Sequence, residues 1–229
     1  MFFSILYPIF NDLKDEIIYL FLFNVFTVFV TLPGWYLVNV GLRSNFLLPF
    51  LLGLMLCLPL ALCLFGLAYT TYDISNQITI RLSTLFKHIR QTWKSALFWG
   101  VINIVVIAMA IFNFRFYLAF DAQWAYFLQI FFLGLLFIWL VLQLITLPLY
   151  PRLNTAKYWE ILPRAGALLG KYPGKMLVLV IFVTLFVLLA AWFPFVVLFF
   201  LFSLIAVFAN RFVDAPFKRE LEKRPRKKE

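Results

Sequence analysis

Few side chains of this chain carry the chemistry that enzymes use. His88 is the single histidine, and Cys57 and Cys63 are the two cysteines, both inside one apolar stretch. One histidine excludes an H-E-x-x-H zinc site, and neither a G-x-S-x-G motif nor a glycine-rich phosphate loop occurs. The two thiols lie more than one helical turn apart on different sides of a helix, so no disulfide is expected between them. The sequence therefore predicts a protein that is not an enzyme and holds no cofactor or metal ion.

Uncharged polar side chains inside the apolar stretches are the remaining candidates for a functional site. They are Asn24, Thr27, Thr31, Asn103, Gln129, Gln143, Thr146 and Thr184. Because an unpaired amide is costly in hydrocarbon, we expect them to face the interior of a helix bundle. There they either connect helices by hydrogen bonds or line a site for a neutral solute, and we favour the first. Asp73 and Asp121 fall at the edges of apolar stretches, so ion-coupled transport is not expected.

The composition shows what kind of element must position these residues. Of the 229 residues 65% are apolar, 21% are aromatic and only 13% are charged, and the mean hydropathy is +0.97. Soluble domains are about half apolar and about one quarter charged. The composition therefore excludes a soluble enzyme and a nucleic-acid-binding domain, and it predicts an all-α, polytopic membrane helix bundle.

Charge-free stretches define the expected spans, which are residues 17–41, 45–72, 95–114, 122–151 and 176–210. About 20 helical residues cross a bilayer, so each of the first four stretches holds one helix. The fifth is too long for one crossing, and Pro194 interrupts it. We expect it to form two short helices, 176–192 and 195–210, packed as a hairpin. The prediction is a bundle of six transmembrane helices.

The distribution of basic residues supports six helices with both termini in the cytoplasm. Four segments then share the cytoplasmic side, and they hold 1, 4, 5 and 8 lysines and arginines, whereas the other side holds only Arg43 and Arg115. This asymmetry follows the positive-inside rule. Residues 1–212 are expected to form a single bundle domain. Residues 213–229 are expected to be a flexible basic tail that binds anionic headgroups and not nucleic acid.

Two cytoplasmic connectors are expected to be amphipathic helices at the membrane interface. In residues 76–93, apolar side chains recur at helical spacing, at Ile78, Leu82, Leu85, Ile89 and Trp93. In residues 152–175 the pattern is less regular, at Leu162, Ala165, Leu168 and Leu169. We expect both connectors to lie on the headgroups, and docking to a partner protein is the alternative.

Several short motifs occur in an order that is typical of one protein family. Asn24 is followed nine residues later by Pro33, the second residue of a Leu-Pro pair. A basic and aromatic pattern that runs into the third span is formed by Phe86, Arg90, Trp93, Lys94, Leu97 and Gly100. A Pro-Leu-x-x-Arg element joins Pro148 to Arg152, and a further stretch begins at Arg164. Over residues 20–210 the chain resembles the YesL-like family of bacterial integral membrane proteins, although that family usually has a Thr-Ile-Gly-Pro-like turn after the Leu-Pro pair.

The resemblance implies a role but supplies no catalytic residues. Members of the family often accompany carbohydrate importers of the ATP-binding-cassette (ABC) type. The implied function is that of a non-enzymatic accessory subunit of such an importer in the bacterial inner membrane, and the alternative is a small stand-alone carrier or channel. The candidate contacts with a partner or with lipid are Asn24, Pro33, Trp93, Lys94, Gly100, Asn103, Pro148, Arg152 and Arg164.

Overall fold

The computed structural model describes residues 3–44, 46–153 and 157–222, and every regular element in these ranges is a helix. In chain order these helices are α1 (Phe3–Ser44), α2 (Leu47–Leu56), α3 (Leu58–Ser75), α4 (Leu82–Leu118), α5 (Gln123–Leu153), α6 (Tyr158–Lys171), α7 (Pro173–Trp192), α8 (Pro194–Phe199) and α9 (Leu201–Glu222). Within the described residues, five stretches are long and apolar enough to cross a membrane. They are Glu16–Ser44, Leu47–Ser75, Leu82–Leu118, Gln123–Leu153 and Pro173–Trp192. The protein is thus an all-helical, multi-pass membrane protein.

Helix α3 lies at the centre of the structure and packs against α1, α4, α5 and α9. Its residues Phe65 and Leu67 are both 0% exposed. Residues two positions apart on a helix point in nearly opposite directions, so these side chains enter two different apolar clusters. Phe65 packs with Tyr150 of α5 and Ile161 of α6, whereas Leu67 lies in a cluster with Phe23 of α1. Helix α3 therefore joins the two halves of the core.

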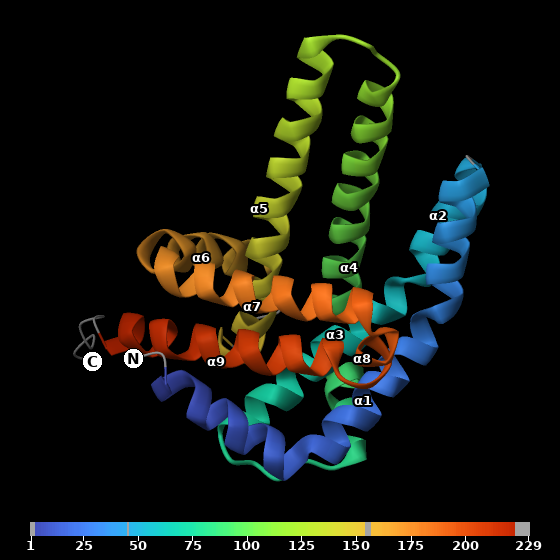
Figure 1. Ribbon diagram of the computed structural model, residues 1–229. Helices are drawn as coiled ribbons and strands as arrows, with labels where there is room; N and C mark the ends of the chain where they lie inside the picture. Colours follow the sequence, from blue (N-terminus) through green and yellow to red (C-terminus); the bar gives the residue numbers. More distant parts are fainter. Residues whose placement is uncertain (1–2, 45, 154–156, 223–229) are drawn as a thin grey trace.

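Two helical hairpins extend from this centre (Figure 1). Helices α4 and α5 project as an antiparallel pair, and α1 and α2 form a second pair beside them. Helices α7 and α9 run side by side in opposite directions, with α8 between them in the chain. Many apolar side chains of the α4–α5 hairpin are exposed, among them Phe112, Phe127, Ile130 and Phe137. This hairpin therefore presents apolar surface to its surroundings.

Three glycines allow α1 and α2 to approach each other closely. A Cβ atom added to Gly41 would lie 2.6 Å from the Cα of Phe50, and one on Gly34 would lie 2.7 Å from the Sγ of Cys57. On α2, a Cβ at Gly53 would overlap the backbone of Val38. Small residues at such positions let the backbones of neighbouring membrane helices pack directly on each other.

The expected spans agree with the structure in their positions. The first four charge-free stretches lie almost entirely within candidate spans, and the fifth breaks at Pro194, as predicted. Helix α7 ends at Trp192, Phe193 is extended with φ −124° and ψ 87°, and Pro194 begins α8. Proline lacks the backbone N–H that would continue the helical ladder, which explains the break.

Three finer expectations differ from the structure. The segment 195–210 is not one helix, because α8 ends at Phe199 and α9 begins at Leu201. Helix α9 continues to Glu222, so the boundary drawn at residue 212 falls inside a helix, and residues 223–229 lie outside the described chain. The expectation of a separate amphipathic helix over residues 76–93 is also wrong. Residues 82–93 are the first turns of α4, since no proline or glycine separates them from the following span.

The second expected connector does form a separate helix, α6. Its buried side chains are Tyr158, Ile161, Ala165 and Leu168. This stripe shares Ala165 and Leu168 with the expected one, and it packs in the first apolar cluster. The apolar face of α6 is therefore covered by the protein itself.

Substitution Gly41→Ala should lower the stability of the protein, because the added methyl overlaps the backbone around Phe50. We expect a loss of about 2 kcal/mol in the free energy of unfolding, measured by denaturant titration in detergent micelles. The matched control is Gly134→Ala on α5, where a Cβ meets nothing within 4 Å. There alanine should leave stability unchanged or raise it by up to about 1 kcal/mol. Equal stability of the two variants would contradict the close approach.

Candidate functional site

The most extensive polar cluster centres on Arg152, in the last turn of α5. Its Nη1 donates to the carbonyl oxygen of Pro148 at 2.6 Å and to Oδ1 of Asn210 at 2.6 Å. Its Nη2 donates to the carbonyl oxygen of Asn210 at 2.9 Å and lies 3.4 Å from the carboxylate of Asp214. The side chain of Arg152 is only 2% exposed. A buried guanidinium thus connects α5 to α9.

Helix α3 completes this cluster. The guanidinium carbon of Arg152 lies 5.0 Å from the ring centroid of Tyr72, a cation–π distance. The amide Nδ2 of Asn210 donates to the carbonyl oxygen of Ala68 at 3.1 Å and to the hydroxyl of Thr71. Three helices that are far apart in sequence therefore meet at one buried positive charge.

Proline shapes the end of α5 where this cluster forms. Pro148 and Pro151 both lie inside the helix, and each removes one N–H from the helical ladder. The Arg152 guanidinium donates to the carbonyl of Pro148 in this part of the helix. Planar, multiply donating arginine suits such a site, because one side chain serves a carbonyl, an amide and a carboxylate together. In the described residues, Arg152 Nε and the Tyr150 hydroxyl are buried atoms without a hydrogen-bond partner.

A second polar cluster supplies hydrogen bonds to the backbone at the break between α8 and α9. The Oδ1 of Asn24 on α1 accepts hydrogen bonds from the backbone N–H groups of Phe202 at 2.7 Å and Ser203 at 3.2 Å. Its Nδ2 donates to the carbonyl oxygen of Val197 at 2.7 Å. Asn24 is 0% exposed. It thus acts as a helix cap supplied by another helix, because the first N–H groups of α9 need an acceptor.

A third network joins α4, α5 and α6. The indole N–H of Trp99 donates to Oε1 of Gln143 at 2.7 Å, and Nε2 of Gln143 donates to the hydroxyl of Tyr158 at 3.1 Å. Asn103 accepts from the indole of Trp139 at 3.0 Å through Oδ1. Burial raises the pKa of Tyr158 above its ordinary value, an effect that the bond from Gln143 partly offsets. The network therefore consists of neutral groups.

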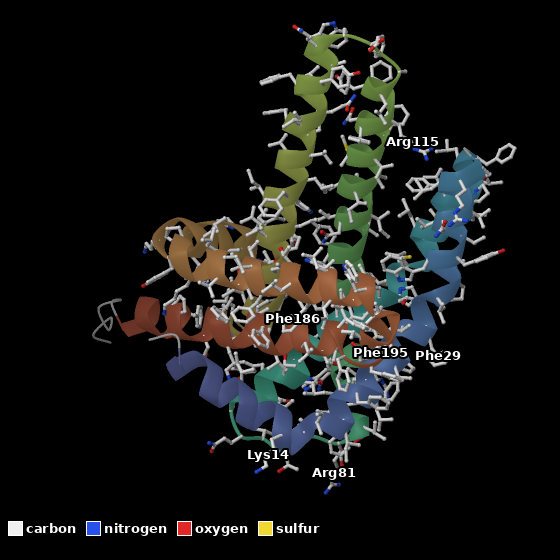
Figure 2. The ribbon with its side chains drawn as sticks, viewed as in Figure 1. Lys14, Phe29, Arg81, Arg115, Phe186 and Phe195 are labelled. Carbon is white, nitrogen blue, oxygen red and sulfur yellow. The ribbon has the colours of Figure 1, made fainter. Side chains whose placement is uncertain are left out.

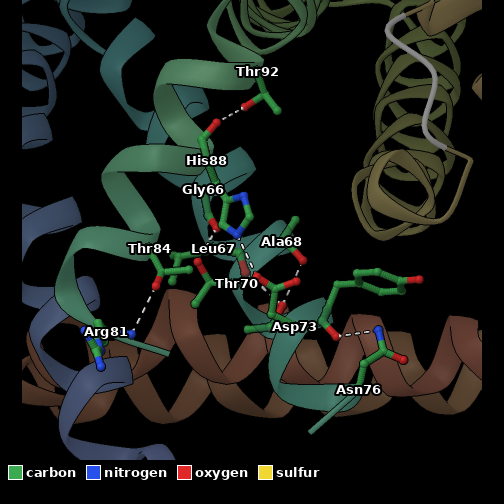
Figure 3. Close-up of polar contacts among 12 residues, drawn as sticks. Gly66, Leu67, Ala68, Thr70, Asp73, Asn76, Arg81, Thr84, His88 and Thr92 are labelled. Carbon is green, nitrogen blue, oxygen red and sulfur yellow. Dashed lines mark hydrogen bonds and ion pairs between the residues drawn. The ribbon is translucent and has the colours of Figure 1, made fainter. Parts of the chain in front are cut away.

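The single histidine, His88, lies near the start of α4 and pairs with an acidic residue of α3. His88 Nε2 lies 2.7 Å from Oδ2 of Asp73, at the end of α3 (Figure 3). The same close-up shows Thr84 accepting from the backbone N–H of Arg81 at 3.1 Å. Within the part of the chain that the structure describes, no group of three histidine, cysteine or acidic residues could hold a metal ion. The pair fixes the loop between α3 and α4.

The nine candidate contact residues do not form one site. Pro148 and Arg152 meet in the first cluster, while Asn24 and Asn103 lie in the other two networks. Gly100 is buried, and a Cβ there would lie 2.7 Å from the Cβ of Ala61 on α3. The remaining four are exposed: Pro33 on α1, Trp93 and Lys94 side by side on α4, and Arg164 on α6.

Sequence reasoning missed the partners of these residues. Asn210 ends an expected apolar stretch, Asp214 belongs to the expected tail, and Ser203 lies inside the stretch, so none of them is among the predicted polar residues. Ser203 donates to the carbonyl oxygen of Leu20 at 2.7 Å. The available signal was the recurrence of polar side chains at residues 203, 210 and 214, which are spaced seven and four apart and share one helical face.

No protein family, curated protein or solved structure matches the chain.

Substitution Arg152→Leu should destabilise the protein strongly. It leaves the carbonyl and amide oxygens of Asn210 and the carboxylate of Asp214 without their shared donor. We expect a loss of about 3 kcal/mol in the free energy of unfolding. Arg164→Leu, on an exposed position of α6, is the control and should change stability by less than about 0.5 kcal/mol. Similar losses at both positions would show that Arg152 does not connect the helices.

Substitution Asn24→Leu should leave the N–H groups of Phe202 and Ser203 unpaired in an apolar environment. The expected loss is about 3 kcal/mol in detergent-based unfolding titrations. Thr31→Val on the same helix is the control, because Thr31 donates only to carbonyls of α1, at 2.8 and 3.1 Å. That control should cost less than about 1 kcal/mol. A stability close to that of wild type for Asn24→Leu would exclude the capping role.

Proposed function

We propose that the protein is a non-enzymatic accessory subunit of a membrane transport complex. The observation that supports this role best is the projecting α4–α5 hairpin. It carries exposed apolar side chains along both helices. Most of the polar side chains at depth, such as Asn24 and Gln143, bond to other groups of the chain, although in the described residues Gln129 Nε2 is buried without a partner and Thr184 is exposed. A stand-alone carrier instead needs polar groups that converge on a cavity. The resemblance to the YesL-like family suggests a carbohydrate importer of the ABC type as the partner.

Cytoplasmic basic residues supply a second contact surface in this proposal. Lys94 and Arg164 are both exposed, and Lys94 Nζ lies 5.6 Å from the ring of Trp93. These side chains can meet acidic protein surfaces or lipid phosphates. We place α9, preceded by α8, as a sixth crossing, so that both termini lie in the cytoplasm of a bacterial cell.

The placement of basic residues supports this orientation. Lys14 and Arg81 lie at the same end of the molecule, and Arg115 lies toward the other end (Figure 2). Cytoplasmic segments attract lysine and arginine, and Lys14 and Arg81 belong to segments that we assign to the cytoplasm.

Cysteine labelling tests the orientation in a background in which Cys57 and Cys63 are replaced by alanine. An impermeant thiol reagent added outside the cell should modify Arg43→Cys and Arg115→Cys. It should leave Lys87→Cys and Lys223→Cys unmodified until the membrane is permeabilised. Labelling of Lys223→Cys from outside would show that α9 does not cross back.

Charge reversal tests the accessory role. Lys94→Glu combined with Arg164→Glu should reduce co-purification with the membrane-spanning subunits of a carbohydrate ABC importer by about tenfold, the equivalent of about 1.4 kcal/mol. Arg43→Glu, assigned to the opposite side, is the matched control and should have no effect. Deletion of the gene should lower sugar uptake. Sugar movement by the purified protein alone in liposomes, with an importer that works equally well without it, would establish the carrier alternative.

A further inference from the structure

An apolar cleft separates the two hairpins near their tips. It has a volume of about 580 Å³ and lies between the end of α1, the start of α2 and the second half of α4. Its walls include Leu47, Phe50 and Leu51 from α2 and Met109, Phe112 and Phe116 from α4. The three α4 residues lie three and four positions apart, so they form one stripe along the helix. The volume falls within the range of about 300–1,000 Å³ that is usual for ligand sites.

The wall formed by α1 and α2 is held in place by the glycine contacts described above. Gly41 itself lines the cleft, and it packs directly on the backbone at Phe50. The opposite wall belongs to α4, which packs against α5 in the second hairpin. Each wall thus has its own internal packing. The cleft forms because the two hairpins diverge as they extend from α3.

Arginine lies at one end of the cleft. Arg115 lines it, and its Nη2 donates to the carbonyl oxygen of Leu42 at 2.7 Å, bridging the tips of α4 and α1 (Figure 2). Arg43 follows Leu42, and its side chain is exposed. The nearest acidic residue along α4 and the following turn, Asp121, accepts a hydrogen bond from the Tyr126 hydroxyl at 3.3 Å. The cleft therefore has a basic end, and its wall along α4 is apolar except for Asn113.

We propose that this cleft binds an anionic phospholipid, with one acyl chain between α2 and α4 and the phosphodiester at Arg115 and Arg43. Both walls lie in stretches that can cross a membrane, so acyl chains are the apolar molecules that reach them at high concentration. A phosphate oxygen can accept charge-assisted hydrogen bonds from arginine, which explains basic residues at the mouth of an apolar cleft. The site does not depend on the proposed transport partner, because lipid and chain alone form it.

Native mass spectrometry of the purified full chain in detergent tests the site. With dioleoyl phosphatidylglycerol added, wild type should retain one lipid molecule more tightly than it retains dioleoyl phosphatidylcholine, which has the same acyl chains. Arg115→Gln should weaken the retention of phosphatidylglycerol by about tenfold. Arg81→Gln is the matched control at the opposite end of the molecule and should change nothing. Inorganic phosphate should not displace the lipid, because it cannot fill the apolar part of the cleft.

A second variant tests the acyl part of the site separately. Ala108 lines the cleft, and Ala108→Phe should fill it and reduce the retention of both lipids. The thermal midpoint of each variant without added lipid shows whether the variant is folded. If Ala108→Phe does not fold, Met109→Ala, which enlarges the cleft, is used in its place. Equal retention of the two lipids, unchanged retention in Arg115→Gln, or unchanged retention when the cleft is filled or enlarged would overturn the proposal.

Discussion

The structure depends on one constraint, which is that backbone polar groups inside a bilayer must find hydrogen-bond partners within the protein. This chain breaks its helices in apolar sequence at Pro194 and at Phe200, and two prolines inside α5 each remove one backbone N–H. Asn24 bonds the N–H groups that the break before α9 exposes, and Arg152 bonds a carbonyl near the end of α5, where the two prolines lie. Asn24 and Arg152 both also join segments that are more than 50 residues apart in the sequence, since Asn24 bonds Phe202 and Arg152 bonds Asn210. The helix breaks therefore depend on the tertiary contacts, because side chains from distant segments bond the backbone groups that the breaks expose.

The same contacts explain why one region of the molecule is closely connected and another is not. Helices α1, α3, α5 and α9 form the closely connected region. The Arg152 cluster joins α3, α5 and α9, the Asn24 cap joins α1 to α9, and the two apolar clusters pack around α3. The tips of the α1–α2 and α4–α5 hairpins extend beyond these contacts (Figure 1). Their exposed surfaces are apolar, which suits lipid or the spans of another membrane protein. The proposed lipid site and the apolar part of the proposed partner surface lie on these extensions.

Chemically identical residues play different roles here, and their positions in the sequence do not distinguish them. Arg152 and Arg164 both belong to the segment 152–175, which we assign to the cytoplasm, yet one is buried against α9 and the other is exposed on α6. The stripe expected before the third span shows the same limit. Leu85 is buried, but Leu82 and Trp93 are 46% and 48% exposed, because α3 and α1 cover only one side of α4. Helical periodicity identifies a face, but the neighbouring helices decide whether that face is covered.

The sequence by itself determined the class of protein, the positions of the candidate spans and the break at Pro194, because these follow from local hydropathy and from the missing N–H of proline. It also indicated that Asn24, Asn103 and Gln143 face the interior, since an unpaired amide is costly in hydrocarbon. Only the tertiary structure decided which groups those amides meet. It brought Asn210 and Asp214 to Arg152, placed α3 at the centre and left a cleft beside Arg115. The reason is that hydrogen bonds and close packing between helices depend on the relative positions of distant segments, which no local pattern in the sequence encodes.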